Sequence, residues 1–294
     1  MPQSTAGKTN ILIVGMRKTL KIIDKGFGHF VYLCSRILWF PLGWILDKIP
    51  SFNKARIKHL SHLHGANPYA EIMKESKLWY FLNQVYTRYF YYKIRKLPQV
   101  QWQQERWNNY GEIYYENRTD DKLPPKFEEF FKDALSRFNV SSVFDIGCGG
   151  GTIAKILCAK YPKINLTGID IADKSLEIYN REIKPIYKNF DFIKGSILDH
   201  LEILKKVELF YTYNVFMHLD ETEIRLFFQY IANLPNRIIG IFHEPYTEEK
   251  MTKPYPSGPK DFCHNFKSYI SNYNFTLLNA ETTGTFGIFY FTTK

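Results

Sequence analysis

Residues 123–294 of this chain alternate short apolar runs with stretches of helical spacing. Between the runs, apolar residues recur three and four positions apart, for example at Ile153, Ile156 and Leu157, which is the spacing of one helix face. Short buried strands separated by helices are typical of a doubly wound, mostly parallel α/β sheet. The runs predicted as strands cover residues 141–146, 165–170, 190–195, 207–213 and 237–242.

The pattern changes near the C-terminus. Residues 260–273 predict a helix, and residues 275–294 predict two strands around a Thr283-Gly284 turn. Strands joined by a tight turn are antiparallel. The predicted fold class is therefore α/β, with a seven-stranded sheet that ends in an antiparallel hairpin and a mainly helical region before it.

The N-terminal third has a different pattern, and we predict residues 1–104 as a basic, aromatic-rich helical region and residues 105–294 as the α/β domain. Residues 8–25 are apolar at helical spacing with a basic opposite face. Residues 29–46 are almost wholly apolar but contain Arg36 and Pro41, which makes them marginal as a membrane span.

Positive charge is concentrated in this region. Residues 1–60 hold ten Lys or Arg and two Asp or Glu, so they carry +8 of the total charge of +10, while residues 123–294 are neutral overall. Tryptophans beside basic residues suit the surface of an anionic membrane, so we predict peripheral attachment to the inner, cytoplasmic face of a membrane. The alternative is a helical cap that packs on the α/β domain or on a second subunit of a homo-oligomer. A basic region alone is weak evidence for nucleic acid.

Cysteine and histidine usage predicts no metal centre. Cys34, Cys148, Cys158 and Cys263 form no CxxC pair, which favours reduced thiols in the cytoplasm. A histidine cluster at residues 59–64 has no carboxylate or cysteine beside it, so a solvated basic stretch is favoured over a metal site.

The stretch VFDIGCGGGT, residues 143–152, follows the first predicted strand. Gly147, Gly149 and Gly151 allow a sharp turn that a ligand can approach closely, and the helix that follows offers free N–H groups. Asp170 ends the second predicted strand, where a carboxylate can accept both ribose hydroxyls of an adenosine ligand. A dinucleotide fingerprint would need glycine where Thr152 stands.

With this spacing, residues 105–294 resemble the class I S-adenosylmethionine-dependent methyltransferases, a Rossmann-like family whose sheet also ends in an antiparallel hairpin. The segments KGSILD (194–199) and YNVFMHLD (213–220) follow in the family's order. The resemblance implies S-adenosyl-L-methionine as cofactor, with the glycine turn against its methionine part, Asp170 on the ribose, Ser196 and Ile197 at the adenine, and Tyr213 and Asn214 near the methyl group. The cofactor-binding residues that it implies are Asp145, Gly147, Cys148, Gly149, Gly151, Asp170, Ile171, Ser196, Ile197, Tyr213 and Asn214.

Methyl transfer to a hydroxyl or amine needs a group that takes the proton. His218, at the mouth of the fourth strand, is the first candidate for this general base, and its alternative role is helix capping or packing beside the cofactor. His243 and Glu244 at the end of the fifth strand, and His264 before the last helix, are the other candidates.

Several acceptor classes are excluded by resemblance. The segment Tyr213-Asn214-Val215-Phe216 lacks the (D/N)-P-P-(Y/F) motif of methyltransferases that act on amino groups of DNA bases, the Pro-Cys nucleophile of cytosine-C5 enzymes is absent, and the carboxylates of metal-dependent catechol enzymes are missing. A neutral α/β domain also argues against RNA. We predict an O-methyltransferase for a small-molecule, glycan or lipid-linked acceptor at a membrane surface. The alternative is a non-catalytic methyltransferase-fold subunit of a membrane-associated assembly.

Overall fold

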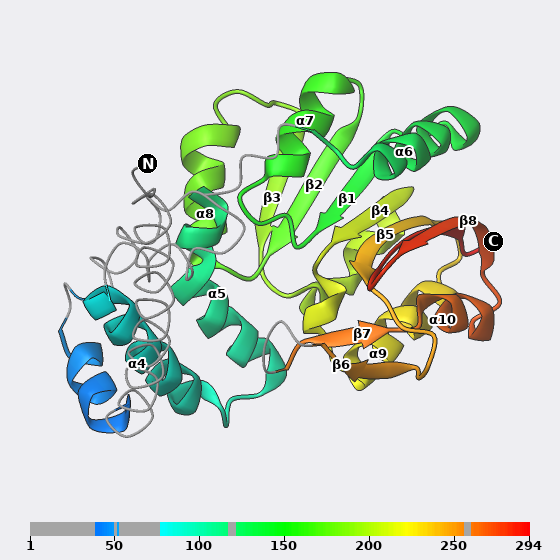
Figure 1. Cartoon of the computed structure of the whole chain (residues 1–294). Helices are drawn as coiled ribbons and strands as arrows, with labels where there is room; N and C mark the ends of the chain where they lie inside the picture. The colour runs from blue at the N-terminus through cyan, green and yellow to red at the C-terminus, as the bar shows by residue number, and fades with distance from the viewer. Residues whose placement is uncertain (1–38, 50–51, 53–76, 117–121, 256–259) are drawn as a thin grey trace, which may run out of the picture. The chain divides into compact units, whose positions relative to one another are not determined.

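The structure is a computed structural model that describes residues 39–49, 52, 77–116, 122–255 and 260–294 (Figure 1). The chain divides into two compact units, Met1–Lys96 and Leu97–Lys294. The boundary predicted between residues 104 and 105 lies inside helix α5 (Gln99–Glu116), which belongs as a whole to the second unit.

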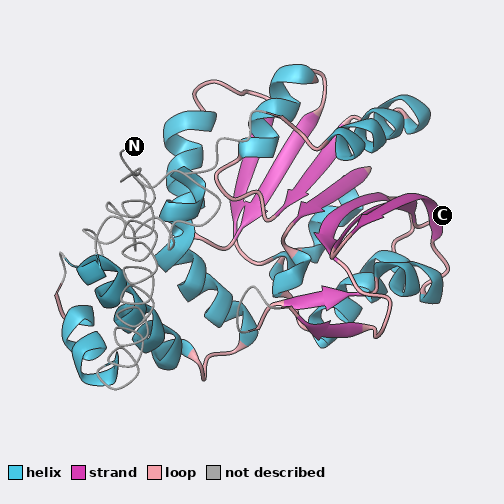
Figure 2. Ribbon diagram, in the orientation of Figure 1, coloured by secondary structure: helices cyan, strands magenta, loops and turns pink. Residues whose placement is uncertain are grey.

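A seven-stranded sheet in the order β3-β2-β1-β4-β5-β9-β8 forms the centre of the second unit (Figure 2). Strands β1 to β5 are parallel, and β9 pairs antiparallel with both β5 and β8. The strands are β1 (Ser142–Ile146), β2 (Asn165–Asp170), β3 (Phe190–Lys194), β4 (Leu209–Tyr213), β5 (Ile239–Pro245), β8 (Thr276–Thr283) and β9 (Phe286–Thr292). The predicted fold class is confirmed, including the antiparallel hairpin at the C-terminus.

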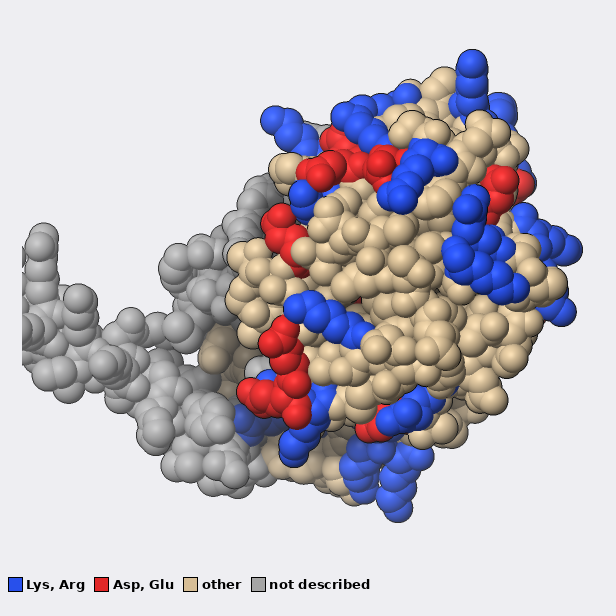
Figure 3. Space-filling model, turned by 90° about the vertical axis from the view of Figure 1, so that its right-hand side faces the viewer, with Lys and Arg blue, Asp and Glu red and all other residues tan. Residues whose placement is uncertain are grey.

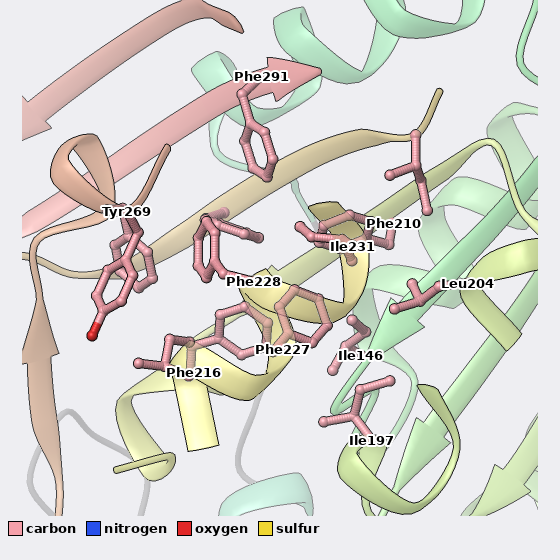
Figure 4. Packing of buried hydrophobic residues seen from close by; sticks show 14 of the residues in the cluster. Ile146, Ile197, Leu204, Phe210, Phe216, Phe227, Phe228, Ile231, Tyr269 and Phe291 are labelled. Atoms are coloured by element: carbon pink, nitrogen blue, oxygen red, sulfur yellow. The ribbon is translucent and has the colours of Figure 1, made fainter. Parts of the chain in front are cut away.

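Side chains on successive strand positions point to opposite faces of the sheet. Because the strands are apolar at successive positions, both faces of the sheet are covered by helices. Val143 packs with residues of α6 (Pro125–Phe138), α7 (Thr152–Lys160) and the π-helical turn Tyr179–Ile183 that continues α8 (Asp173–Ile178). Phe144 packs on the other face with residues of α9 (Glu221–Ala232) and α10 (Phe266–Asn272). Figure 4 shows aromatic side chains filling this second core, among them Phe216, Phe227 and Phe228.

One predicted helix is wrong over its first part. In the segment 260–273, Phe262–His264 is strand β7, which pairs with β6 (Thr252–Pro254), and only Phe266–Asn272 is helical. Asn265 separates the two elements, because its side chain accepts a hydrogen bond from the Ser268 N–H and so begins the helix there. Along the sequence, the β6–β7 pair therefore comes between β5 and α10.

Acidic and basic side chains are interspersed on the face of the molecule in Figure 3. This arrangement agrees with the zero net charge of residues 123–294.

The described part of the first unit is helical, as predicted. It consists of a helix at residues 39–47 and α4 (Lys77–Ile94), which are joined by the ion pair between Lys93 Nζ and Asp47 Oδ2 at 3.0 Å. Gly43 lies against Tyr89, where a Cβ would overlap the tyrosine ring. The predicted amphipathic segment 8–25 is outside the described residues. No helix in the described ranges combines the length and the apolar character that a membrane crossing requires.

Candidate active site

The glycine turn connects β1 to α7 at the carboxyl end of the sheet. Gly147, Gly149 and Gly151 have φ angles of 72°, 53° and 71°, in the left-handed region that residues with a side chain rarely adopt. Space also requires glycine at the first of these positions, because a Cβ on Gly147 would overlap the side chain of Val215. The turn therefore packs closely against the loop that follows β4.

Asp170 holds the turn in this shape. Its Oδ2 accepts a hydrogen bond from the Gly149 N–H at 2.9 Å, and its Oδ1 accepts from the Ala172 N–H at 2.8 Å and from the Ser175 hydroxyl at 2.9 Å. Burial raises the pKa of Asp170, and these hydrogen bonds oppose the rise by favouring the ionised form. One carboxylate thus ties the end of β2 to the glycine turn.

These elements surround a pocket that encloses about 1050 Å³, counting the part open to solvent. Every residue predicted to bind the cofactor lines it except Gly151, which instead is the N-cap of α7. Those that line it are Asp145, Gly147, Cys148, Gly149, Asp170, Ile171, Ser196, Ile197, Tyr213 and Asn214. The fold therefore brings together four separate segments of the sequence that the prediction grouped in one site.

His218 also lines this pocket, at the end of the short helical turn Phe216–His218 that follows β4. Its Nδ1 is 2.8 Å from Asp261 Oδ1, and the same carboxylate oxygen forms an ion pair with Arg106 at 2.6 Å. Burial lowers the pKa of His218, while Asp261 acts in the opposite direction. A carboxylate on Nδ1 fixes the ring and leaves Nε2 as the nitrogen that can take a proton.

Asp261 is suited to orient this imidazole because it stays ionised. Burial by itself would raise the pKa of Asp261, but His218 and Arg106 outweigh that effect and hold the pKa well below its ordinary value. The Trp107 ring meets the His218 ring edge to face, with centroids 5.3 Å apart. The imidazole is thereby held from two sides, by a charge and by an aromatic ring.

The other three candidates for the general base do not line the described part of the pocket. His243 stacks on Tyr213 with ring centroids 4.2 Å apart, on the neighbouring strand. Glu244 is fully buried and accepts hydrogen bonds from the backbone N–H groups of Val215 at 2.8 Å and Met217 at 3.2 Å. Burial raises the pKa of Glu244 to about 7, and its hydrogen bonds show that it holds the loop that carries His218.

His264 is fully buried, and both of its ring nitrogens have partners. Nδ1 is 2.9 Å from the Thr252 hydroxyl, and Nε2 is 2.9 Å from the Phe216 carbonyl oxygen. Burial lowers the pKa of His264 to about 4, so the ring is neutral near pH 7. It fastens the β6–β7 hairpin to the loop that follows β4.

Residues 143–236, from β1 to the end of α9, match a family model described as a methyltransferase domain. This chain contains a class I S-adenosylmethionine-dependent methyltransferase domain. The predictions of the family and of its cofactor are confirmed by this match and by the sheet order.

Known proteins resemble this methyltransferase domain at low sequence identity. A release factor glutamine methyltransferase of Aliivibrio fischeri is 27% identical over 110 residues, which are 34% of this chain and 38% of that protein. The chain thus matches about two fifths of the length of this curated relative. A magnesium protoporphyrin IX methyltransferase of Synechocystis PCC 6803, solved with bound S-adenosylmethionine, superposes with a TM-score of 0.50 and 13% identity, over 67% of this chain and 96% of that one. An O-methyltransferase family protein from Burkholderia thailandensis superposes with a TM-score of 0.51 and 10% sequence identity, over 70% of each chain.

The residues of the methyltransferase domain fit the cofactor at its methionine end as well. Asn214 lines the pocket with a φ of 59°, and its buried Oδ1 has no hydrogen-bond partner among the described residues. A buried acceptor of this kind costs free energy until a donor reaches it. The ammonium group of S-adenosylmethionine is such a donor.

Two parts of the site were missed by sequence reasoning. Helix α5 contributes Gln99, Val100, Gln103 and Trp107 to the pocket, although its N-terminal part was assigned to the preceding region. Asp261 was missed because it is a single acidic residue 43 positions after its partner His218, and no local pattern marks it. In the described ranges no group of three or more His, Cys, Asp or Glu could hold a metal ion, and the histidine cluster at residues 59–64 lies outside those ranges.

Proposed function

We propose that this protein is an S-adenosylmethionine-dependent O-methyltransferase that acts on a small-molecule acceptor, with His218 as its general base. The observation that carries the proposal is the His218–Asp261 pair, which lines the same pocket as the glycine turn and Asp170. A base held by a carboxylate beside a cofactor site is suited to take the proton of a hydroxyl that is methylated.

Each group in the pocket has a role in this reaction. Asp170 binds the ribose, Ser196 and Ile197 border the adenine, and Asn214 accepts from the ammonium group. When bound, S-adenosylmethionine supplies an electrophilic methyl group. His218 Nε2 accepts the proton of the acceptor hydroxyl, and the negative charge of Asp261 stabilises the resulting imidazolium. Holding acceptor and base in one pocket supplies the alignment on which a displacement reaction depends.

Titration calorimetry of the full chain with S-adenosylmethionine tests the first step of this proposal. We expect one binding site per chain and transfer of labelled methyl from the cofactor to a hydroxyl compound in an extract fraction. Absence of cofactor binding would reject the enzymatic function and favour the non-catalytic subunit. Binding with transfer only to nitrogen or carbon acceptors would reject the O-methyltransferase assignment.

We further propose that the acceptor is a glycan or lipid-linked compound presented at an anionic membrane, and that the first unit attaches to this membrane. Its helix at residues 39–47 and the residues just after it expose large apolar side chains: Phe40 is 45%, Trp44 51%, Ile45 48% and Ile49 42% exposed. The adjoining sequence supplies the +8 charge of residues 1–60. Apolar and aromatic side chains beside basic residues favour the membrane interface.

We expect the native protein to float with vesicles of phosphatidylcholine and phosphatidylserine and to float less when phosphatidylserine is omitted. Each basic residue near an anionic surface contributes about 1 kcal/mol, and the inserted rings add an attraction that salt does not screen. The double substitution Phe40→Gln, Trp44→Gln should lower the bound fraction severalfold.

Ile186→Gln is the matched control for flotation, because Ile186 is a 68% exposed apolar residue of the second unit. It should float as the native protein does. If the native protein does not float, or if the double variant floats equally well, the first unit is a protein-packing element and the membrane-presented acceptor is rejected.

A further inference from the structure

Helix α5 contributes several of the pocket-lining residues that are outside the predicted cofactor set. We name one part of the lining the acceptor wall: it consists of Gln99, Val100, Gln103 and Trp107 on α5, together with Leu219, which follows the Phe216–His218 turn, and Glu223 in the first turn of α9. Neither the acceptor wall nor the rest of the described pocket lining contains Lys or Arg, whereas Asp145, Asp170 and Glu223 all line it. The charged side chains of the described lining are therefore acidic.

Cations are present on the surrounding elements, and one of them, Lys260, opposes the rise that burial causes in the pKa of Glu223, but none is among the described lining residues. Arg106 pairs with Asp261 at 2.6 Å, and Lys194 pairs with Asp173 at 3.0 Å. Lys260 Nζ donates to the Leu97 carbonyl oxygen at 3.0 Å. The N-terminal end of α7 also suits an anion, but it lies at the glycine turn, in the half assigned to the cofactor.

The polar groups of the acceptor wall are uncharged amides apart from Glu223. Gln99 Nε2 donates to the His218 carbonyl oxygen at 2.6 Å and to the Lys260 carbonyl oxygen at 3.2 Å, so this amide is fixed. Gln103 is 3% exposed, and its Oε1 has no hydrogen-bond partner among the described residues. A buried amide oxygen can be satisfied by a hydroxyl donor and repels a carboxylate or phosphate.

We propose that the acceptor is an uncharged, largely apolar hydroxyl compound, which favours a small molecule or a lipid over a glycan, and that the acceptor wall excludes compounds that carry a carboxylate or phosphate. This rests on the proposed function of the same pocket. Trp107, Val100 and Leu219 supply apolar contact, and Gln103 Oε1 accepts from a hydroxyl. An anion there loses its hydration without contacting a cation of the described pocket lining, beside the carboxylate of Glu223, so the wall discriminates by repulsion as well as by attraction.

Three probes of one shape test this class: 2-naphthol, 2-naphthoate and 2-naphthyl phosphate. Each is titrated at neutral pH into the full chain saturated with S-adenosylhomocysteine, and binding is measured by calorimetry. We expect 2-naphthol to bind at least about tenfold more tightly than either anion, a difference of roughly 1.4 kcal/mol. Equal or tighter binding of an anion overturns the proposal, and so does the absence of binding by all three.

A substitution on the acceptor wall supplies the second arm. Val100→Lys places a cation there, and Val100→Met adds similar length without charge. We expect Val100→Lys to raise the affinity for 2-naphthoate about tenfold relative to 2-naphthol, and Val100→Met to keep the native preference. An unchanged ratio in Val100→Lys contradicts a role for the missing cation. A protein that binds S-adenosylmethionine but prefers the anions refutes the acceptor class alone, whereas loss of cofactor binding refutes the proposed function.

Discussion

His218→Ala should lower kcat for methyl transfer by about 10²–10⁴-fold and leave the affinity for S-adenosylmethionine unchanged. The reason is that the imidazole lines the pocket, is oriented by Asp261 at 2.8 Å, and is only 12% exposed. Transfer of labelled methyl measures the first quantity and titration calorimetry the second.

The pH dependence of the activity tests the same assignment of His218. A general base must be deprotonated, so activity falls as the pH drops through the pKa of His218. Burial lowers that pKa, so the acidic limb of the profile should lie below the ordinary value for histidine, and Asp261→Asn should move it lower still, because the carboxylate raises the pKa.

His243→Phe is the matched control for the base. It removes a titratable ring but preserves the stack with Tyr213 and Phe286. Its activity should stay within about tenfold of native. If His218→Ala loses less than about tenfold while His243→Phe is inactive, the base is His243 and the assignment of His218 is wrong.

Asp170→Ala should weaken S-adenosylmethionine binding by about 10²-fold or more. A hydrogen bond to a charged group is worth roughly 1.5–3 kcal/mol, and both ribose hydroxyls are proposed to donate to this carboxylate. The same substitution removes the acceptor of the Gly149, Ala172 and Ser175 hydrogen bonds. We therefore also expect a lower free energy of unfolding, by roughly 1–3 kcal/mol, measured by urea denaturation.

Ser175→Ala separates the two consequences of the Asp170 substitution. It deletes one of the hydrogen bonds to the carboxylate but does not line the described pocket. We expect it to lower stability and to leave cofactor affinity within about threefold of native. Both affinities for S-adenosylmethionine are measured under conditions in which circular dichroism shows that the Asp170→Ala and Ser175→Ala variants are folded. Equal losses of affinity would show that Asp170 acts only through the shape of the turn.

The sequence by itself determined the features that depend on neighbouring residues. The strands of the sheet are short apolar runs, and the parallel pairing of β1 to β5 follows from strands alternating with helices, whereas their order comes from the structure. The glycine turn is visible because positive φ angles at Gly147 and Gly149 demand a residue without a side chain. Asp170 could be assigned to the same site because parallel strands place their carboxyl ends at one edge of the sheet.

Only the tertiary structure decided which histidine has the surroundings of a base. The sequence ranks His218 before His243 and His264 only by its place at the mouth of the fourth strand, and it shows no partner for any of the three. The difference comes from contacts between distant segments: Asp261 and Arg106 meet His218, whereas His264 is occupied by Thr252 and by backbone carbonyl groups.

The acceptor side of the pocket likewise depended on tertiary packing. The first part of α5 lies in the region predicted to be helical, but a helical pattern alone does not say which element the helix covers. Its position follows from contacts made more than a hundred residues away, such as Gln99 to the His218 carbonyl oxygen and Arg106 to Asp261. Local patterns determined the proposed cofactor half of this site because one turn and three strand ends build it, and packing between distant segments determined the half proposed to receive the acceptor.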